Sequence, residues 1–144
     1  MSDPVKRATL LLVDDLPANI KILLTALRDE FEILVATSGP LALKTVANKP
    51  VDLIVLDIVM PEMDGYEVCR QLKDNEATSN IPVIFLTGGD ADSDEREGLA
   101  LGAVDYVTKP VNPQLLKRRI ESQLTIRELM LRVTELEQAL AEKS

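Results

Sequence analysis

The sequence predicts an α/β protein in which five short parallel strands alternate with helices and the last helix is extended. Three observations support this fold class. Five apolar runs of strand length are separated by segments whose apolar residues recur at helical spacing. Hydrophobic residues make up 46% of the 144 residues and aromatic residues only 3%, which indicates an aliphatic core. Strands that are separated by helices pair in parallel through crossover connections.

The strands are expected where Val, Leu and Ile are concentrated between residues typical of loops. Each run is too short for a buried helix, and Gly, Pro, Asp or Asn lies close to its ends. The predicted strands are residues 9–13, 31–36, 52–57, 81–87 and 104–107.

The helices are expected between these strands and after the last of them. Pro17 suits the first turn of a helix, and Asn112 followed by Pro113 is typical of a helix cap and first turn. In the first helix Ile20, Leu23 and Leu27 recur at helical spacing. The predicted helices are residues 17–29, 40–48, 65–74, 93–101 and 113–141.

Composition excludes several classes of function. The formal net charge of −8 argues against direct nucleic-acid binding, which needs a basic face. The absence of histidine removes the most common general base and zinc ligand, and any histidine phosphocarrier role. Cys69 is the single cysteine, so no internal disulfide forms and a cytoplasmic location is expected. No apolar run is long enough to cross a membrane, and no signal peptide is recognisable.

Three acidic side chains follow two of the predicted strands. Asp14 and Asp15 come directly after residues 9–13, and Asp57 closes residues 52–57. The carboxyl ends of parallel strands meet at one edge of the sheet, which is where open α/β sheets place their ligands. Carboxylates held close together repel one another unless a cation neutralises them, and Mg²⁺ prefers such oxygen ligands. We therefore expect a magnesium site with Asp57 at its edge as a nucleophile.

Two further polar side chains follow the last two strands. Thr87 precedes Gly88, and Lys109 precedes Pro110. A hydroxyl and an ammonium at this edge could contact the oxygens of a phosphoryl group, whose transfer depends on positioning and charge neutralisation. Each feature has a simpler interpretation as a strand-end hydroxyl or a surface lysine. Their occurrence together favours phosphoryl transfer to Asp57.

These motifs resemble the receiver domain of two-component response regulators over residues 8–124. The motifs are Leu11-Leu-Val-Asp-Asp15, Leu56-Asp-Ile-Val-Met-Pro-Glu-Met-Asp-Gly65, Leu86-Thr-Gly88 and Gly102-Ala-Val-Asp-Tyr-Val-Thr-Lys-Pro110. The resemblance implies a flavodoxin-like, doubly wound sheet of strand order 2-1-3-4-5, with residues 1–124 as the receiver domain. It also implies that Asp57 accepts a phosphoryl group from a sensor histidine kinase or a histidine phosphotransfer protein.

The resemblance assigns the remaining roles. Mg²⁺ would be held by Asp14, Asp15, Asp57 and the backbone carbonyl of Val59. Lys109 and Thr87 would take part in catalysis by contacting the phosphoryl group. Beyond this self-phosphorylation and slow autodephosphorylation, no enzymatic activity is expected.

The family also suggests a conformational switch. When the threonine moves onto the phosphate, an aromatic residue of the last strand swings inward, and Thr87 and Tyr106 match these two positions. An ordinary tyrosine at the sheet edge is the simpler interpretation of Tyr106. The Lys109–Pro110 peptide bond is expected to be cis, as in the family.

Residues 125–144 form a helical extension with a short heptad pattern. β-Branched residues at one core position and Leu at the other favour a parallel two-stranded coiled coil. The extension is therefore expected to be a coiled-coil linker or dimerisation segment, unless the same face packs on its own domain. We call its apolar residues the seam: Ile126, Leu129, Val133, Leu136 and Leu140.

Two other functions also use some of these features. Phosphatases of the haloacid dehalogenase type also use a strand-end aspartate with Mg²⁺, but they need a second acid two residues later, where this chain has Val59. A degenerate receiver would act as a dimerisation or binding module without phosphorylation. Such a receiver typically lacks part of the acidic pocket or the lysine, and here both are present.

Overall fold

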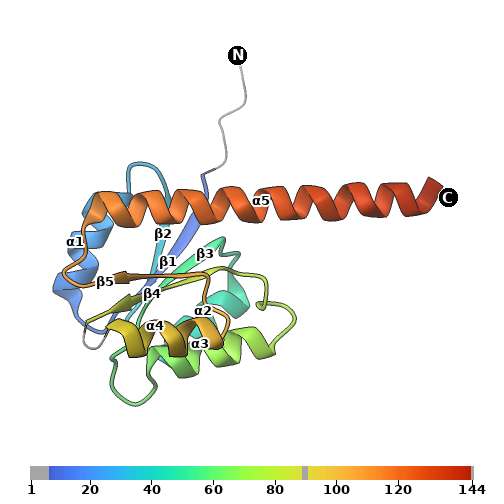
Figure 1. Ribbon diagram of the computed structural model, residues 1–144. Coiled ribbons are helices and arrows are strands. Elements are labelled where there is room, and N and C mark those ends of the chain that lie inside the picture. The colour runs from blue at the N-terminus through green and yellow to red at the C-terminus, as the bar shows by residue number, and fades with distance from the viewer. Residues whose placement is uncertain (1–6, 89–90, 144) are drawn as a thin grey trace.

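A computed structural model describes residues 7–88 and 91–143, which form a five-stranded parallel sheet between two layers of helices (Figure 1). The strand order is β2-β1-β3-β4-β5, which confirms the predicted flavodoxin-like fold. The strands are β1 (Thr9–Val13), β2 (Glu32–Ala36), β3 (Leu53–Asp57), β4 (Val83–Thr87) and β5 (Asp105–Thr108). The helices are α1 (Pro17–Leu27), α2 (Gly39–Asn48), α3 (Gly65–Asp74), α4 (Ala91–Ala100) and α5 (Pro113–Lys143).

The central strands are buried on both faces, so their apolar residues alternate between two cores. Leu11 and Ile54 point to a core that is covered by α2 and α3, whereas Leu10 and Leu53 point to a core that is covered by α1 and α5. This alternation follows from the period of two in a strand. It explains why β1 and β3 read as continuous apolar runs rather than as alternating ones.

Side chains cap α2 and α5, and the cap at Asn112 falls where the sequence predicts it. Asn112 accepts hydrogen bonds from the backbone N–H groups of Gln114 and Leu115 at the start of α5. Ser38 caps α2 by accepting from Leu41 N at 3.2 Å. These side-chain oxygens satisfy N–H groups that lack a partner within the helix, which determines where each helix begins.

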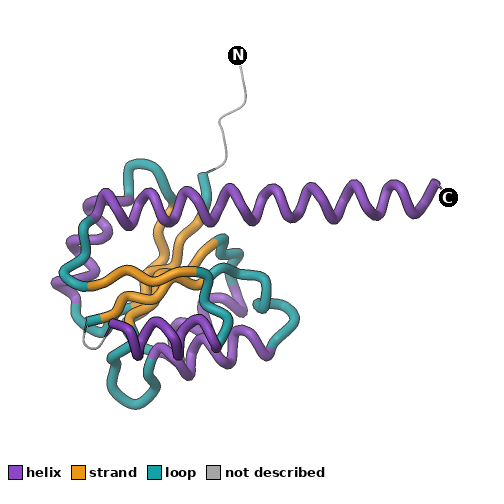
Figure 2. The backbone as a smooth tube through the Cα atoms, in the orientation of Figure 1, coloured by secondary structure: helices purple, strands orange, loops and turns teal. Residues whose placement is uncertain are grey.

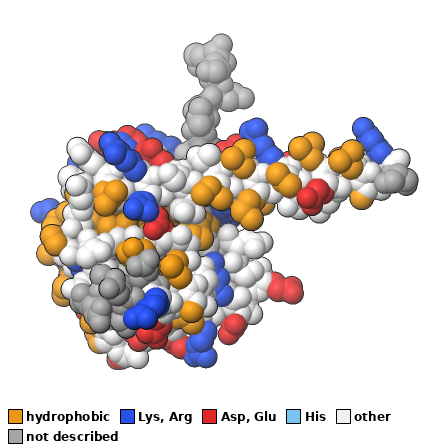
Figure 3. All heavy atoms as spheres, viewed as in Figure 1, with side chains coloured by type: hydrophobic (Ala, Val, Ile, Leu, Met, Phe, Trp, Pro, Cys, Tyr) orange, Lys and Arg blue, Asp and Glu red, His pale blue; other side chains and the backbone are white. Residues whose placement is uncertain are grey.

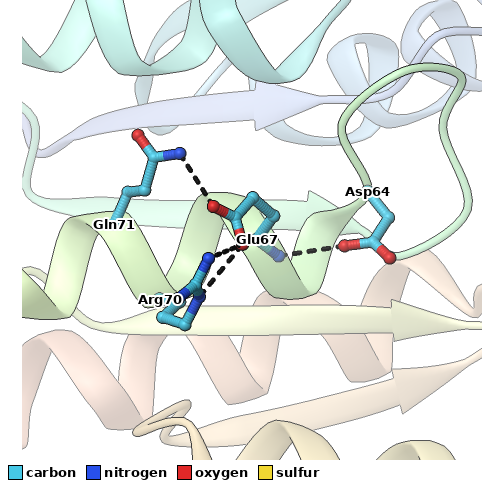
Figure 4. A network of polar contacts seen from close by, with 4 residues as sticks. All are labelled: Asp64, Glu67, Arg70 and Gln71. Atoms are coloured by element: carbon cyan, nitrogen blue, oxygen red, sulfur yellow. Dashed lines mark hydrogen bonds and ion pairs between the residues drawn. The ribbon is translucent and has the colours of Figure 1, made fainter.

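The polar network at the start of α3 holds the loop that follows Asp57 (Figure 4). Asp64 accepts a hydrogen bond from Glu67 N at 2.9 Å, and the Glu67 carboxylate accepts from Arg70 and Gln71. Gly65 N donates to the carbonyl of Ile58 at 2.8 Å, so the loop folds back onto the end of β3. A Cβ on Gly65 would lie 2.3 Å from the carbonyl oxygen of Asp57, so only glycine permits this approach.

Helix α5 continues past the sheet as a single unbroken helix (Figure 2). Leu116 and Ile120 are fully buried against the sheet, and Leu124 is partly buried. The seam residues beyond them are between 47% and 69% exposed, and apolar side chains line this projecting arm (Figure 3). Ile126 borders a hollow that residues of the domain also line, whereas the seam residues from Leu129 onward are more than half exposed.

None of the helices that the structure describes has the combination of length and apolar character that a bilayer span requires.

Candidate functional site

The register of the strands brings the acidic side chains together. Val13 pairs with Leu56 across β1 and β3, so Asp14 and Asp57 follow at the same level of the sheet. Carboxylate oxygens of Asp14, Asp15 and Asp57 all lie within 4.8 Å of one another. The structure thus unites the three acids that the sequence singled out.

Asp57 is nearly buried, with 3% of its surface exposed. Burial is the largest cause that raises the pKa of its carboxyl above the ordinary value, and the charge of Asp14 acts in the same direction. Hydrogen bonds from Lys109 and from the backbone of Val59 favour the charged form but do not fully offset the burial. A cation beside this group would therefore stabilise the ionised carboxylate.

The acids are held in place by their own loops. Asp14 is 1% exposed, and its two oxygens accept hydrogen bonds from Leu16 N at 2.9 Å and from the Asn19 side chain at 3.2 Å. Asp15 is only partly buried. The role of Asn19 was missed in the sequence, although its position in the first turn of α1 places it within reach of the acidic pair.

The three carboxylates fit a hard divalent cation. One oxygen of each carboxylate lies within 4.8 Å of the others, so Asp14, Asp15 and Asp57 could hold Mg²⁺ together. The Val59 side chain is 76% exposed, and its backbone N–H donates to the Asp57 carboxylate.

Lys109, which follows β5, forms an ion pair with Asp57. Its Nζ is 2.9 Å from Asp57 Oδ1, and the backbone N–H of Lys109 donates to the carbonyl of Thr87 at 2.6 Å. The lysine side chain is 29% exposed, so its ammonium can be reached from solvent. The Lys109–Pro110 peptide bond is cis.

Thr87 brings a hydroxyl group to the same edge. Asp57 pairs with Leu86, so Thr87 lies one residue farther along β4. Within the described residues, Thr87 Oγ1 is buried and has no hydrogen-bond partner. A buried hydroxyl without a partner is costly, so this group is available to a ligand.

Tyr106 belongs to β5 beside these residues. It pairs with Phe85, and its half-buried ring packs against the core on the α2 and α3 side of the sheet. The ring therefore lies at the boundary between the core and the surface.

The arrangement matches a known family. Residues 10–121 match the family model of the response regulator receiver domain. The chain belongs to this family. The receiver domain thus accounts for most of the chain and for all of the acidic site.

Individual relatives agree with this assignment. The Vibrio cholerae protein named "Probable cyclic di-GMP phosphodiesterase" is 50% identical over 122 residues, which are 85% of this chain and 28% of that protein. Response regulator PleD of Caulobacter vibrioides is 43% identical over 116 residues, which are 80% of this chain and 26% of PleD. This receiver chain therefore spans about a quarter of the length of these relatives.

A solved structure shows the same fold. The chemotaxis protein CheY4 of Vibrio cholerae superposes with a TM-score of 0.77 and 28% identity, covering 81% of this chain and 98% of CheY4. Almost the whole of CheY4 is thus matched, while about a fifth of this chain lies outside the match.

Proposed function

We propose that Asp57 accepts a phosphoryl group from a sensor histidine kinase or a histidine phosphotransfer protein in a Mg²⁺-dependent reaction. The observation that carries this proposal is the environment of the Asp57 carboxylate. It is buried between two other carboxylates and Lys109, beside a threonine hydroxyl that has no partner among the described residues. A structural ion pair would need neither the additional acids nor the spare hydroxyl.

In the proposed reaction, an oxygen of Asp57 forms a bond to phosphorus as the bond between phosphorus and the donor imidazole breaks. Lys109 Nζ, now on Asp57 Oδ1, would move its charge onto a phosphoryl oxygen. Thr87 Oγ1 would donate a hydrogen bond to another oxygen, which would satisfy this buried hydroxyl. Mg²⁺ held by the three acids would supply positive charge that offsets the negative charge of the phosphoryl group.

The direct test is the intact mass of the protein after incubation with a small acyl phosphate. With Mg²⁺ we expect the mass of one phosphoryl group, bound as an acid-labile acyl phosphate in the peptide that contains Asp57. When a chelator replaces Mg²⁺ during the incubation, no phosphoryl mass should be added. A stable phosphate on a serine or threonine peptide would contradict the proposal.

Mg²⁺ binding should weaken when Asp15 becomes Asn. The substitution keeps the shape of the side chain but removes one of the three clustered charges. We expect at least about a tenfold loss of affinity, equivalent to about 1.4 kcal/mol, in a calorimetric or NMR titration. Asp105→Asn, on β5, is a matched control that should leave the affinity unchanged. Equal affinities in wild type and Asp15→Asn would place the metal elsewhere.

The phosphorylated form is expected to be long-lived. In the family, the residues two positions after the phosphoacceptor and after the threonine help to orient the hydrolytic water. Here they are Val59 and Gly89, of which Gly89 lies outside the described residues. Val59 presents an exposed side chain that cannot hydrogen-bond to water. Replacing Val59 with Asn should therefore shorten the lifetime measured by loss of the added mass, and loss within seconds in wild type would refute the expectation.

We further propose that residues 1–124 act as the phosphorylated domain and residues 125–144 as its output linker. Phosphorylation would bias Thr87 and Tyr106, and the seam would pair two chains as a parallel homodimer. The exposure of every seam residue supports this division. The phosphoryl group can shift the equilibrium between the inactive and active conformations only as far as it interacts more favourably with one of them.

A further inference from the structure

Helix α5 leaves the domain at Arg127. Leu116 and Ile120 are buried against the sheet, and Arg127 lies seven residues after Ile120, on the same side of the helix. Arg127 thus lies two turns beyond Ile120 on the side of α5 that faces the domain, but its contact with the domain is polar rather than apolar.

Arg127 is bonded to the start of β3 through a single guanidinium nitrogen. Its Nη1 donates to the backbone carbonyl of Asp52 at 2.8 Å and to Asp52 Oδ1 at 3.2 Å. The Arg127 side chain is 28% exposed, so most of it is covered where the helix crosses the edge of the domain. Two acceptors from one residue restrain both the distance and the direction of the guanidinium.

Asp52 is itself firmly held by β1. Its second oxygen, Oδ2, accepts from Thr9 N at 2.7 Å, and its backbone N–H donates to the carbonyl of Thr9 at 2.8 Å. Asp52 therefore belongs to the rigid edge of the sheet, and Arg127 is attached to that edge rather than to a loose side chain.

Among the described residues, no other side-chain hydrogen bond or ion pair joins the helix to the domain at this point. A hollow of about 510 Å³ lies on one side of Arg127, between Met130 and the segment that contains Asn80. A second hollow, of about 350 Å³, lies on the other side and is lined by Arg7 and Leu131. Farther along the arm, the side-chain bonds found among the described residues stay within the helix, such as Arg132 to Glu128 at 3.0 Å.

We infer that the contact between Asp52 and Arg127 is a clasp that fixes the direction and the rotational phase of the α5 arm relative to the domain. At about 100° per residue, the centre of the seam lies roughly 140° around the helix from Arg127. With Arg127 held against the domain, the seam therefore faces largely away from the domain, where a second copy could pair with it. Without it, the arm would bend at the two hollows, although the seam itself would remain intact.

The clasp also bears on regulation, a part of the inference that rests on the proposed function. A change at Asp57 can reorient the paired arms only if each arm moves with its own domain. Arg127 provides that mechanical connection at the edge of the sheet opposite to the acidic site. Releasing it should leave phosphorylation intact and uncouple it from the arms.

Distances between two spin labels test the clasp without any phosphorylation. Labels would be attached at Glu76→Cys and Glu135→Cys in a Cys69→Ala background, with an excess of unlabelled chain so that only distances within one chain are measured. The protein with Arg127 should give a narrow distribution of label-to-label distances, and the Arg127→Gln variant should give a broader distribution. Arg132→Gln, which removes a similar charge farther along the arm, should match wild type.

An unchanged distribution in Arg127→Gln would overturn the clasp. If that variant does not fold by circular dichroism, Arg127→Lys retains the charge and loses the geometry, and it should show the same broadening. Sedimentation with and without beryllofluoride then tests coupling: the shift in dimer affinity seen in wild type should be lost in Arg127→Gln, and an equal shift would refute coupling. If wild type itself shows no shift, the proposed switch fails, while the label distances still decide the clasp.

Discussion

An Asp57→Asn variant is expected to gain no covalent phosphate from an acyl phosphate and Mg²⁺, whereas wild type gains one group. Asn keeps the size and position of the side chain but lacks the nucleophilic carboxylate. The loss should be complete in the intact mass, because the other clustered acids do not share the contact with Lys109 that Asp57 makes. A matched Asp64→Asn variant, in the loop before α3, should be phosphorylated normally. A stoichiometric phosphate on Asp57→Asn would exclude Asp57 as the acceptor.

The Asp57→Asn variant is also expected to be more stable than wild type in metal-free buffer near neutral pH. The pKa of Asp57 is raised in the folded protein, chiefly by burial, even with Lys109 beside it. A raised pKa means that folding favours the protonated form, so stability is greatest below the ordinary pKa and falls as pH rises through the folded value. An Asn side chain does not ionise, so the variant does not lose this stability as pH rises. Denaturant unfolding from below the ordinary carboxyl pKa to neutral pH would measure the difference in unfolding free energy between variant and wild type. Mg²⁺ should reduce this difference by stabilising the ionised carboxylate of the wild type.

Replacing Leu129 and Leu136 with Asp is expected to abolish dimerisation through the arm. Each chain would place two charges in the seam, so four buried leucine side chains, which form two pairs, are lost in a dimer. Burying one leucine contributes about 1.5–3 kcal/mol, so the dimer should weaken by at least on the order of a hundredfold. Sedimentation of wild type and variant over a range of concentrations measures this effect.

The matched control carries the same two charges on the other face of the arm. In Thr134→Asp with Gln138→Asp both substitutions lie outside the seam, and Thr134 lines the hollow beside the domain. This variant should dimerise as wild type does. A monomeric wild type at high concentration, or equal dimerisation in both variants, would show that the arm does not pair through the seam.

The strands and helices could be predicted from the sequence because local signals agree with the tertiary structure. All boundaries fall within two residues of their predicted positions, and β1 and α3 coincide with their predicted ranges. The largest difference at the start of a strand is in β4, which begins at Val83 rather than at residue 81. Pro82 has no N–H to donate to a ladder, and Ile81 is buried in the approach to the strand, so an apolar run alone overestimates its length.

The candidate site could be located because its residues follow strand ends, where parallel pairing makes them neighbours. Contacts between charged residues that are far apart in the sequence leave no comparable pattern in the sequence. Arg127 and Asp52 lie 75 positions apart, and nothing in the local pattern distinguishes them from other charged residues. Thr87 was predicted as a phosphate contact, but its lack of a hydrogen-bond partner depends on three-dimensional packing.

Helix α5 begins beside the acidic edge of the sheet and leaves at the opposite edge, antiparallel to the strands (Figure 1). A kinase that approaches Asp57 and a second chain that binds the arm would therefore occupy separate volumes. The proposed phosphotransfer would then not require the two chains to dissociate, and each subunit of an assembled pair could be phosphorylated in turn. The rate of loading should then be independent of protein concentration across the range in which the pair forms.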